Sequence, residues 1–181
     1  KKLLWNISEN NVDCAKIAQK ICASIYDGIH TSTIDELASE TAQSMILLHP
    51  DYGTLAARIV VSNMHKNTQT SLVDVYNELH KNRLVSSEFM ELIMKHHDVL
   101  EKNLDYDMDY NFDYFGFKTL ERSYLLKLDN MIIERPQHMF LRVALQIHGD
   151  DTQKVIESYK HMSWGYFTHA TPTLFNAGSL Y

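Results

Sequence analysis

The hydrophobic residues near the start of the chain recur at the spacing of an amphipathic helix. Five of them fall on one helix face, namely Cys14, Ile17, Ala18, Ile21 and Ile25. Asp13 or Asn11 is suited to cap the start of this helix, and Gly28 follows its end. The pattern therefore predicts a helix whose apolar face is turned toward a core.

Two more helices are predicted in the next forty or so positions. One is expected to begin at Ser32 or Thr33, because Thr33 and Glu36 have the spacing of a capping box. Its apolar face continues through Leu48. Pro50 suits the first turn of the following helix, where no backbone donor is needed. The residues expected on the buried face of that helix are Tyr52, Leu55, Ala56, Ile59, Val60 and Asn63.

The middle of the chain continues the helical pattern and then breaks it. Ser71 with Asp74 predicts one helix start, and residues 87–100 predict another helix. Residues 104–117 alternate acids with aromatics and show no helical period. We therefore expect an irregular connector there, with its rings packed on the core and its carboxylates in water.

The last third of the chain mixes helices with a turn. The predicted elements, in order, are a short helix over 118–124, two strands within 125–134, a helix from Pro136 to Ile147, a helix over 155–162 and a turn-rich, strand-like segment over 167–181. Asp129-Asn130 is suited to the tight turn of a β-hairpin. The predicted fold class is mainly α with a small β-hairpin, and a domain boundary is expected between roughly residues 68 and 72.

The amino-acid composition and net charge exclude some classes of binding partner. The formal net charge is −6 and 45% of residues are hydrophobic, so the chain has side chains enough for a core and no basic patch for duplex nucleic acid. No apolar run approaches the ~20 residues needed to cross a bilayer. Cys14 and Cys22 lie among apolar residues at helical spacing, so we expect two buried thiols, as in a reducing compartment.

Common catalytic motifs are absent from the sequence. The sequence has no GxSxG, HExxH or CxxC motif and no glycine-rich phosphate loop. His96, His97 and Asp98 are consecutive, so on a helix they point in different directions and do not share one metal ion. No metal site is predicted, and the residues alone indicate a helical module.

Three stretches of the sequence, the second of them in two segments, resemble parts of one family. HPDYGTLAARIVVSNMHK (His49–Lys66) resembles the end of an ATP-cone, and YFGFKTLERSYLLK (Tyr114–Lys127) with ERPQHMFLRVAL (Glu134–Leu145) resembles the helical domain that follows it. FTHATPTLFNAG (Phe167–Gly178) resembles the segment that enters the catalytic ten-stranded barrel. Together they resemble class I ribonucleotide reductase large subunits of the eukaryotic and large-DNA-virus type.

The resemblance implies an architecture. It implies an N-terminally truncated ATP-cone over residues 1–70, an all-α domain over 71–166 and the start of the α/β barrel over 167–181. The family's catalytic cysteine lies shortly after the last motif, so no catalytic residue is expected in this chain, which should be inactive alone.

The resemblance also implies an activity and its partners. Such enzymes reduce ribonucleoside diphosphates to deoxyribonucleoside diphosphates by radical chemistry, with ATP or dATP as allosteric effector. The implied partners are a small radical-generating subunit, further copies of the large subunit, and a reductant of the thioredoxin or glutaredoxin type. The implied compartment is the cytoplasm.

The family's binding positions fall on four residues of this sequence. Thr31, Asp35 and Lys66 match the ATP/dATP contacts of the cone, and Thr171 matches a substrate contact. Thr31 and Asp35 equally suit simple helix capping, and Thr171 suits a plain turn residue. We expect Thr171 to be extended, with its hydroxyl outside any helix, because Pro172 follows it.

The sequence is also compatible with other functions. The same cone occurs in anaerobic reductases and in nucleotide-sensing repressors, although YFGFKTLERSYLL (Tyr114–Leu126) argues against both. A helical module for protein interaction, without catalysis or nucleotide, is the other alternative. Titration with ATP discriminates between it and the cone.

Overall fold

The computed structural model describes residues 2–180. It contains two compact units, the first running up to Asn67 and including Tyr110–Thr119, the second comprising Thr68–Asp109 and the chain from Leu120 onward. Helices dominate both units, and one two-stranded antiparallel sheet is found among the described residues. The prediction of a mainly α fold with a small hairpin is confirmed. No helix within residues 2–180 combines the length and the apolar character needed to cross a bilayer.

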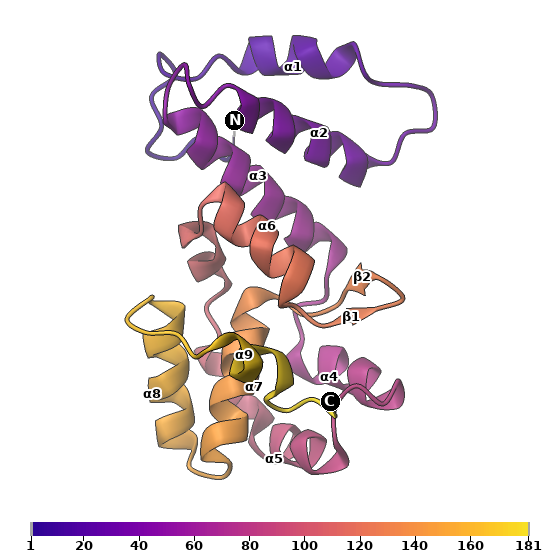
Figure 1. The fold of residues 1–181 in the computed structure, drawn as a ribbon, viewed down its shortest axis with the longest axis vertical. Helices are drawn as coiled ribbons and strands as arrows, with labels where there is room; N and C mark the ends of the chain where they lie inside the picture. The colour runs from indigo at the N-terminus through magenta and orange to yellow at the C-terminus, as the bar shows by residue number, and fades with distance from the viewer. Residues whose placement is uncertain (1, 181) are drawn as a thin grey trace. The chain divides into compact units, whose positions relative to one another are not determined.

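The first unit is built on three helices that pack in sequence, α1 on α2 and α2 on α3 (Figure 1). Their bounds are α1 (Cys14–Cys22), α2 (Thr31–Ser44) and α3 (Asp51–Asn67). Apolar side chains from all three form one core, which includes Ile17, Ile21, Ala42, Met45, Tyr52, Leu55 and Ala56. The buried stripe predicted for α3 is confirmed at Tyr52, Leu55, Ala56 and Val60, with Ile59 and Asn63 partly buried.

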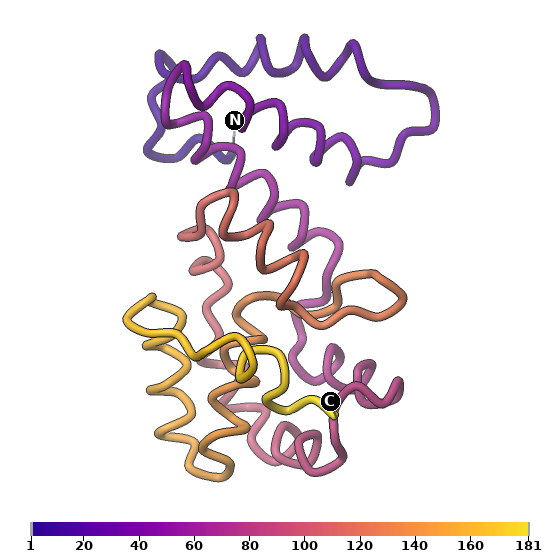
Figure 2. Tube along the Cα trace, viewed as in Figure 1, coloured from indigo at the N-terminus to yellow at the C-terminus, as the bar shows by residue number. Residues whose placement is uncertain are grey.

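Helix α1 is shorter than its apolar pattern predicts. Asp13 caps its start, accepting a hydrogen bond from the Lys16 amide at 3.0 Å, but the helix ends at Cys22. Residues 23–30 then form an open loop (Figure 2), and Ile25 is 44% exposed. The prediction of two buried thiols is wrong for Cys22, which is exposed, because it lies about 100° around the helix from Ile21. Cys14 is partly buried.

Helix α2 begins and ends earlier than predicted. It starts at Thr31 with His30 as its N-cap, so Thr33 and Glu36 do not form the predicted capping box. The helix ends at Ser44, and Leu48 in the turn beyond it is 65% exposed. The hydrophobic period outlasts the helix because Met45, buried in the turn, continues the apolar face.

The second unit contains most of the remaining elements, including the hairpin. Their bounds are α4 (Leu72–Lys81), α5 (Ser87–Asn103), the 3₁₀ helix η1 (Tyr106–Asn111), β1 (Lys127–Leu128), β2 (Met131–Ile132), α7 (Pro136–His148), α8 (Thr152–Ser163) and α9 (Thr171–Asn176). The start of α4 confirms its prediction, since the Ser71 hydroxyl accepts from the Asp74 amide at 3.2 Å. The hairpin turn predicted at Asp129-Asn130 is confirmed, and the φ values of these residues, 50° and 65°, suit a type I′ turn.

The connector predicted over 104–117 is more regular than expected. It contains η1, and helix α6 (Tyr114–Ser123) begins four residues before the predicted Lys118. Asp109 is fully buried, not in water, and accepts a hydrogen bond from Gln137 at 2.9 Å. Phe115 is 68% exposed, not docked on a core. The alternation of acidic and aromatic residues therefore did not predict which of these side chains are buried.

Helix α7 is the centre of the second unit. It packs against α5, α8 and α9, and every residue from Pro136 to Leu145 is buried. Ile147 lies beyond this stretch and is 47% exposed, although its place in the apolar pattern of the helix had indicated burial. A helix buried on all faces needs partners for its polar side chains.

One such partner is the hydroxyl of Tyr159 on α8. It donates to the Gln137 side-chain oxygen at 3.1 Å and accepts from the Asp105 amide at 3.0 Å. Burial raises the pKa of Tyr159 to about 12.

Removing this hydroxyl should destabilise the second unit. We expect Tyr159→Phe to lower the free energy of unfolding at neutral pH by roughly 1–3 kcal/mol, because the buried Gln137 side chain and the Asp105 amide each lose a hydrogen-bond partner. Above pH ~10 an unfolded tyrosine ionises, whereas folded Tyr159 stays neutral until about pH 12. The stabilising contribution is therefore complete below pH ~10 and is lost between the two values. Denaturant unfolding from neutral to alkaline pH should show the difference between parent and variant shrinking, and a constant difference would contradict this. Tyr166→Phe, at a residue 73% exposed, is the matched control.

Candidate functional site

The structure brings two of the predicted effector residues into contact. The Lys66 Nζ lies 2.6 Å from an Asp35 carboxylate oxygen, although the residues are 31 positions apart. Asp35 lies in the second turn of α2 and Lys66 in the last turn of α3. Beside them, the Asn63 side-chain amide donates to the Ser32 carbonyl at 3.2 Å. The start of α2 is thus fastened to the end of α3.

Thr31 lies on the same side of this arrangement. It is the first residue of α2, is exposed, and is four positions before Asp35, so the two side chains share a helix face. The first turn of α2 has no acidic residue, and its N-cap, His30, makes no side-chain capping bond. The positive end of a helix beside a lysine favours a phosphate group, while hydroxyl and carboxylate groups suit a sugar.

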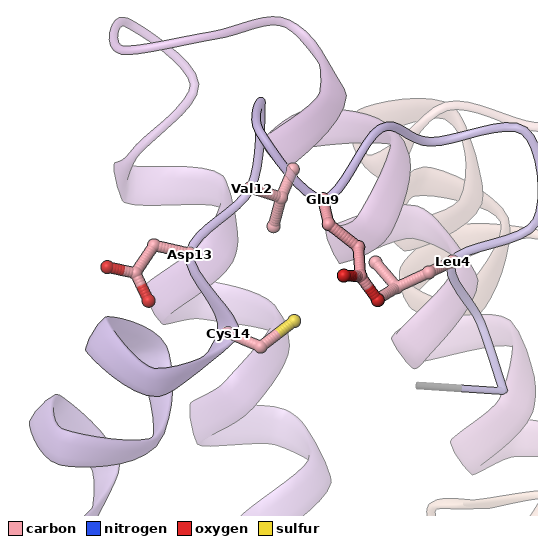
Figure 3. Close-up of a pocket in the computed structure, with 5 residues that line it drawn as sticks. All are labelled: Leu4, Glu9, Val12, Asp13 and Cys14. Carbon is pink, nitrogen blue, oxygen red and sulfur yellow. The ribbon is translucent and has the colours of Figure 1, made fainter.

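A separate cavity in the first unit has a different character. Its volume is about 380 Å³, and the described residues that line it are Leu4, Glu9, Val12, Asp13 and Cys14 (Figure 3). None of the predicted effector residues is among them. Two carboxylates on the lining disfavour an anionic ligand by like-charge repulsion. The cavity is therefore not a suitable phosphate site.

Thr171 does not have the predicted conformation. It is the first residue of α9, not part of an extended segment before a strand. Pro172 is compatible with this helix because the first turn needs no backbone donor from it. The Thr171 hydroxyl lies 3.1 Å from the Tyr124 hydroxyl, and the Tyr124 ring lies against that of Phe175, with centroids 4.8 Å apart.

A buried ion pair that was not predicted from the sequence lies next to α9. Arg142 on α7 binds both oxygens of the Glu134 carboxylate, at 2.6 and 3.0 Å, and both side chains are fully buried. Burial opposes the charge on Arg142, but the carboxylate of Glu134 outweighs it and raises the pKa of Arg142 above its usual range. Burial, with the charge of Glu134, also raises the pKa of Tyr76, which donates to Glu134 at 2.6 Å. The sequence signal that could have indicated this ion pair is an arginine within an otherwise apolar stretch, Met139–Leu145.

Comparison with known proteins identifies similar chains. The model of the ATP cone domain family matches residues 2–67, and the model described as ribonucleotide reductase, all-alpha domain, matches residues 110–180. The chain is 49% identical to the ribonucleoside-diphosphate reductase large subunit of Arabidopsis thaliana, over 99% of this chain and 23% of that protein. It is 50% identical to the large chain of Neurospora crassa, over 98% of this chain and 20% of that one. It is 44% identical to the large subunit of vaccinia virus, over 99% of this chain and 24% of that one. The chain thus spans about a quarter or less of the length of these relatives.

Proposed function

Because the chain belongs to the family of ribonucleoside-diphosphate reductase large subunits, we propose that the whole protein converts ribonucleoside diphosphates to deoxyribonucleoside diphosphates. The observation that carries this proposal is the pair of family matches, over residues 2–67 and 110–180, together with the 49–50% identity to two large subunits over 98–99% of the chain. Residues 1–70 would form the ATP-cone, 71–166 the all-α domain, and 167–181 the entry to the catalytic barrel. The thiols that perform the reduction would lie beyond Tyr181, so this chain alone would be inactive.

The first unit would supply allosteric control. The uncapped start of α2 and Lys66 would hold the phosphates of ATP or dATP, and Thr31 and Asp35 would hold the nucleoside. Lys66 is paired with Asp35 in the structure, so an effector that binds Lys66 through its phosphates would replace this ion pair.

The second unit would contribute to the substrate site. Thr171 would present its hydroxyl to the substrate nucleotide from the start of α9. A small radical-generating subunit, further copies of the large subunit and a thiol reductant would complete the working enzyme, in the cytoplasm.

A calorimetric titration with ATP and dATP tests the effector site. We expect ATP to bind this chain, and adenosine to bind it more weakly because it lacks the phosphates. Lys66→Met should weaken ATP by about tenfold or more, as expected when a hydrogen bond to a charged group is lost. Lys20→Met, in the last turn of α1, is the matched control. A folded chain that gives no heat with either nucleotide would favour the alternative, a helical interaction module without nucleotide.

A further inference from the structure

Helix α9 is too short to hold its own position. It spans Thr171–Asn176, fewer than two full turns, and isolated helices of this length are not stable in water. Its conformation and its place in the second unit therefore depend on contacts with other elements. The structure shows such contacts at its start, at its end and just beyond its end.

The contact at the end of α9 comes from Arg142. The guanidinium donates to the Ala177 carbonyl at 2.6 Å and to the Leu174 carbonyl at 3.2 Å. Carbonyls at a helix C-terminus have no partner within the helix, and a cation there also complements the helix dipole. Arg142 thus caps α9 from a different helix while its other edge stays bound to Glu134.

The chain beyond α9 is fitted closely to the same arginine. Gly178 is buried, with φ of +75°, and a Cβ there would lie 2.9 Å from the Phe89 ring and 3.0 Å from Arg142 Cγ. The Leu180 amide then donates to the Leu84 carbonyl at 3.0 Å. Tyr124 contacts α9 at two points, Thr171 at its start and Phe175 near its end.

We propose that Arg142, oriented by Glu134, is a positioning residue that fixes α9 and thereby the Thr171 hydroxyl for substrate binding. The proposal rests on the proposed function of Thr171. A buried ion pair is often replaceable by apolar side chains with little loss of stability. An apolar side chain at 142, however, leaves the Leu174 and Ala177 carbonyls without a donor.

The test uses the full-length enzyme with its small subunit and a double variant, Glu134→Gln with Arg142→Met. This variant removes both charges together, so no lone charge is buried. In the structure the Leu126 amide donates to Glu134, and the oxygen of a glutamine side chain can accept the same bond. The NH₂ group of the glutamine can donate to the Tyr76 hydroxyl, which itself also donates to the His138 carbonyl. Arg122→Met, at an exposed residue of α6, is the control for loss of an arginine.

Three measurements are made on each protein, and Thr171→Val is added to each. In the double variant we expect a nearly unchanged Tm, hydrogen exchange of the α9 amides about tenfold faster, and kcat/KM about tenfold lower, the size expected for one lost charged hydrogen bond. Thr171→Val should lower kcat/KM in the parent and add little in the double variant, because the two act on the same contact.

The outcomes separate the two proposals. Unchanged exchange at α9 in the double variant overturns the positioning role of Arg142. Faster exchange with unchanged kcat/KM also overturns it, provided that Thr171→Val impairs the parent. If Thr171→Val leaves the parent unimpaired, the substrate contact itself is wrong, and the positioning role falls with it, whatever the exchange shows. Additive losses of kcat/KM likewise show that Arg142 acts elsewhere than through Thr171.

Discussion

Arg142→Met alone is expected to lower the free energy of unfolding by roughly 3–5 kcal/mol, the usual cost of breaking a buried ion pair from one side. The Glu134 carboxylate would stay fully buried and would lose its ion-pair partner, the Arg142 guanidinium. Tyr76 and the Leu126 amide would still donate to it, but no cation would balance its charge. Denaturant unfolding of the chain measures the loss.

A second variant separates lost charge balance from lost packing. Glu134→Gln combined with Arg142→Met should recover most of the lost stability, because no unpaired charge is then buried. Arg122→Met should stay within about 0.5 kcal/mol of the parent, as surface changes usually do. A double variant as unstable as the single one would mean that the shape of Arg142, not its charge, holds the unit together.

Asp35→Ala is expected to weaken the regulation of the full-length enzyme by ATP and dATP by about tenfold in effector concentration. Two effects oppose each other. The variant loses a carboxylate that accepts hydrogen bonds from the effector, worth about 1.5–3 kcal/mol. It also releases Lys66 from an ion pair whose side chains are 27% and 60% exposed, and such pairs are worth about 0–1 kcal/mol. The loss outweighs the release.

Basal turnover should be largely unchanged, because the effector acts by binding linkage and takes no part in the chemistry. Glu36→Ala is the matched control, since Glu36 is exposed, carries the same charge and lies about 100° around α2. The measurement is CDP reduction at increasing dATP and at increasing ATP. An unchanged response in the Asp35 variant would mean that Asp35 only fastens α2 to α3 through its ion pair with Lys66.

Helix caps and turns that depend only on neighbouring residues were predictable from the sequence. Ser71 caps α4 and Asp129-Asn130 turn the hairpin as expected, because each depends on residues within four positions. Periodicity failed where it continues past the end of a helix, as at Ile25 and Leu48. Thr171 was misjudged because the rule for residues before proline competes with the tolerance of a helix's first turn for proline.

Long-range pairs were not predictable from pattern. Asp35 and Lys66 were singled out by family resemblance, and no spacing rule joins residues 31 positions apart. The partners of Arg142 are further examples, since Ala177 lies 35 positions away. Such contacts arise only after helices have packed, so the sequence shows the charged residue but not what neutralises it.

The first unit is discontinuous along the chain, which affects how it can be made. Its helices α1–α3 are complete at Asn67, but Tyr110–Thr119 also belongs to it. Within that returning segment, Tyr110 packs its ring edge-on against Trp5, with centroids 5.3 Å apart, and against His65 at 5.6 Å. During synthesis the unit is therefore incomplete until the ribosome has translated past residue 119. A recombinant cone cut after Asn67 would expose the surface that Tyr110 covers, whereas one ending near Ser123 would retain it.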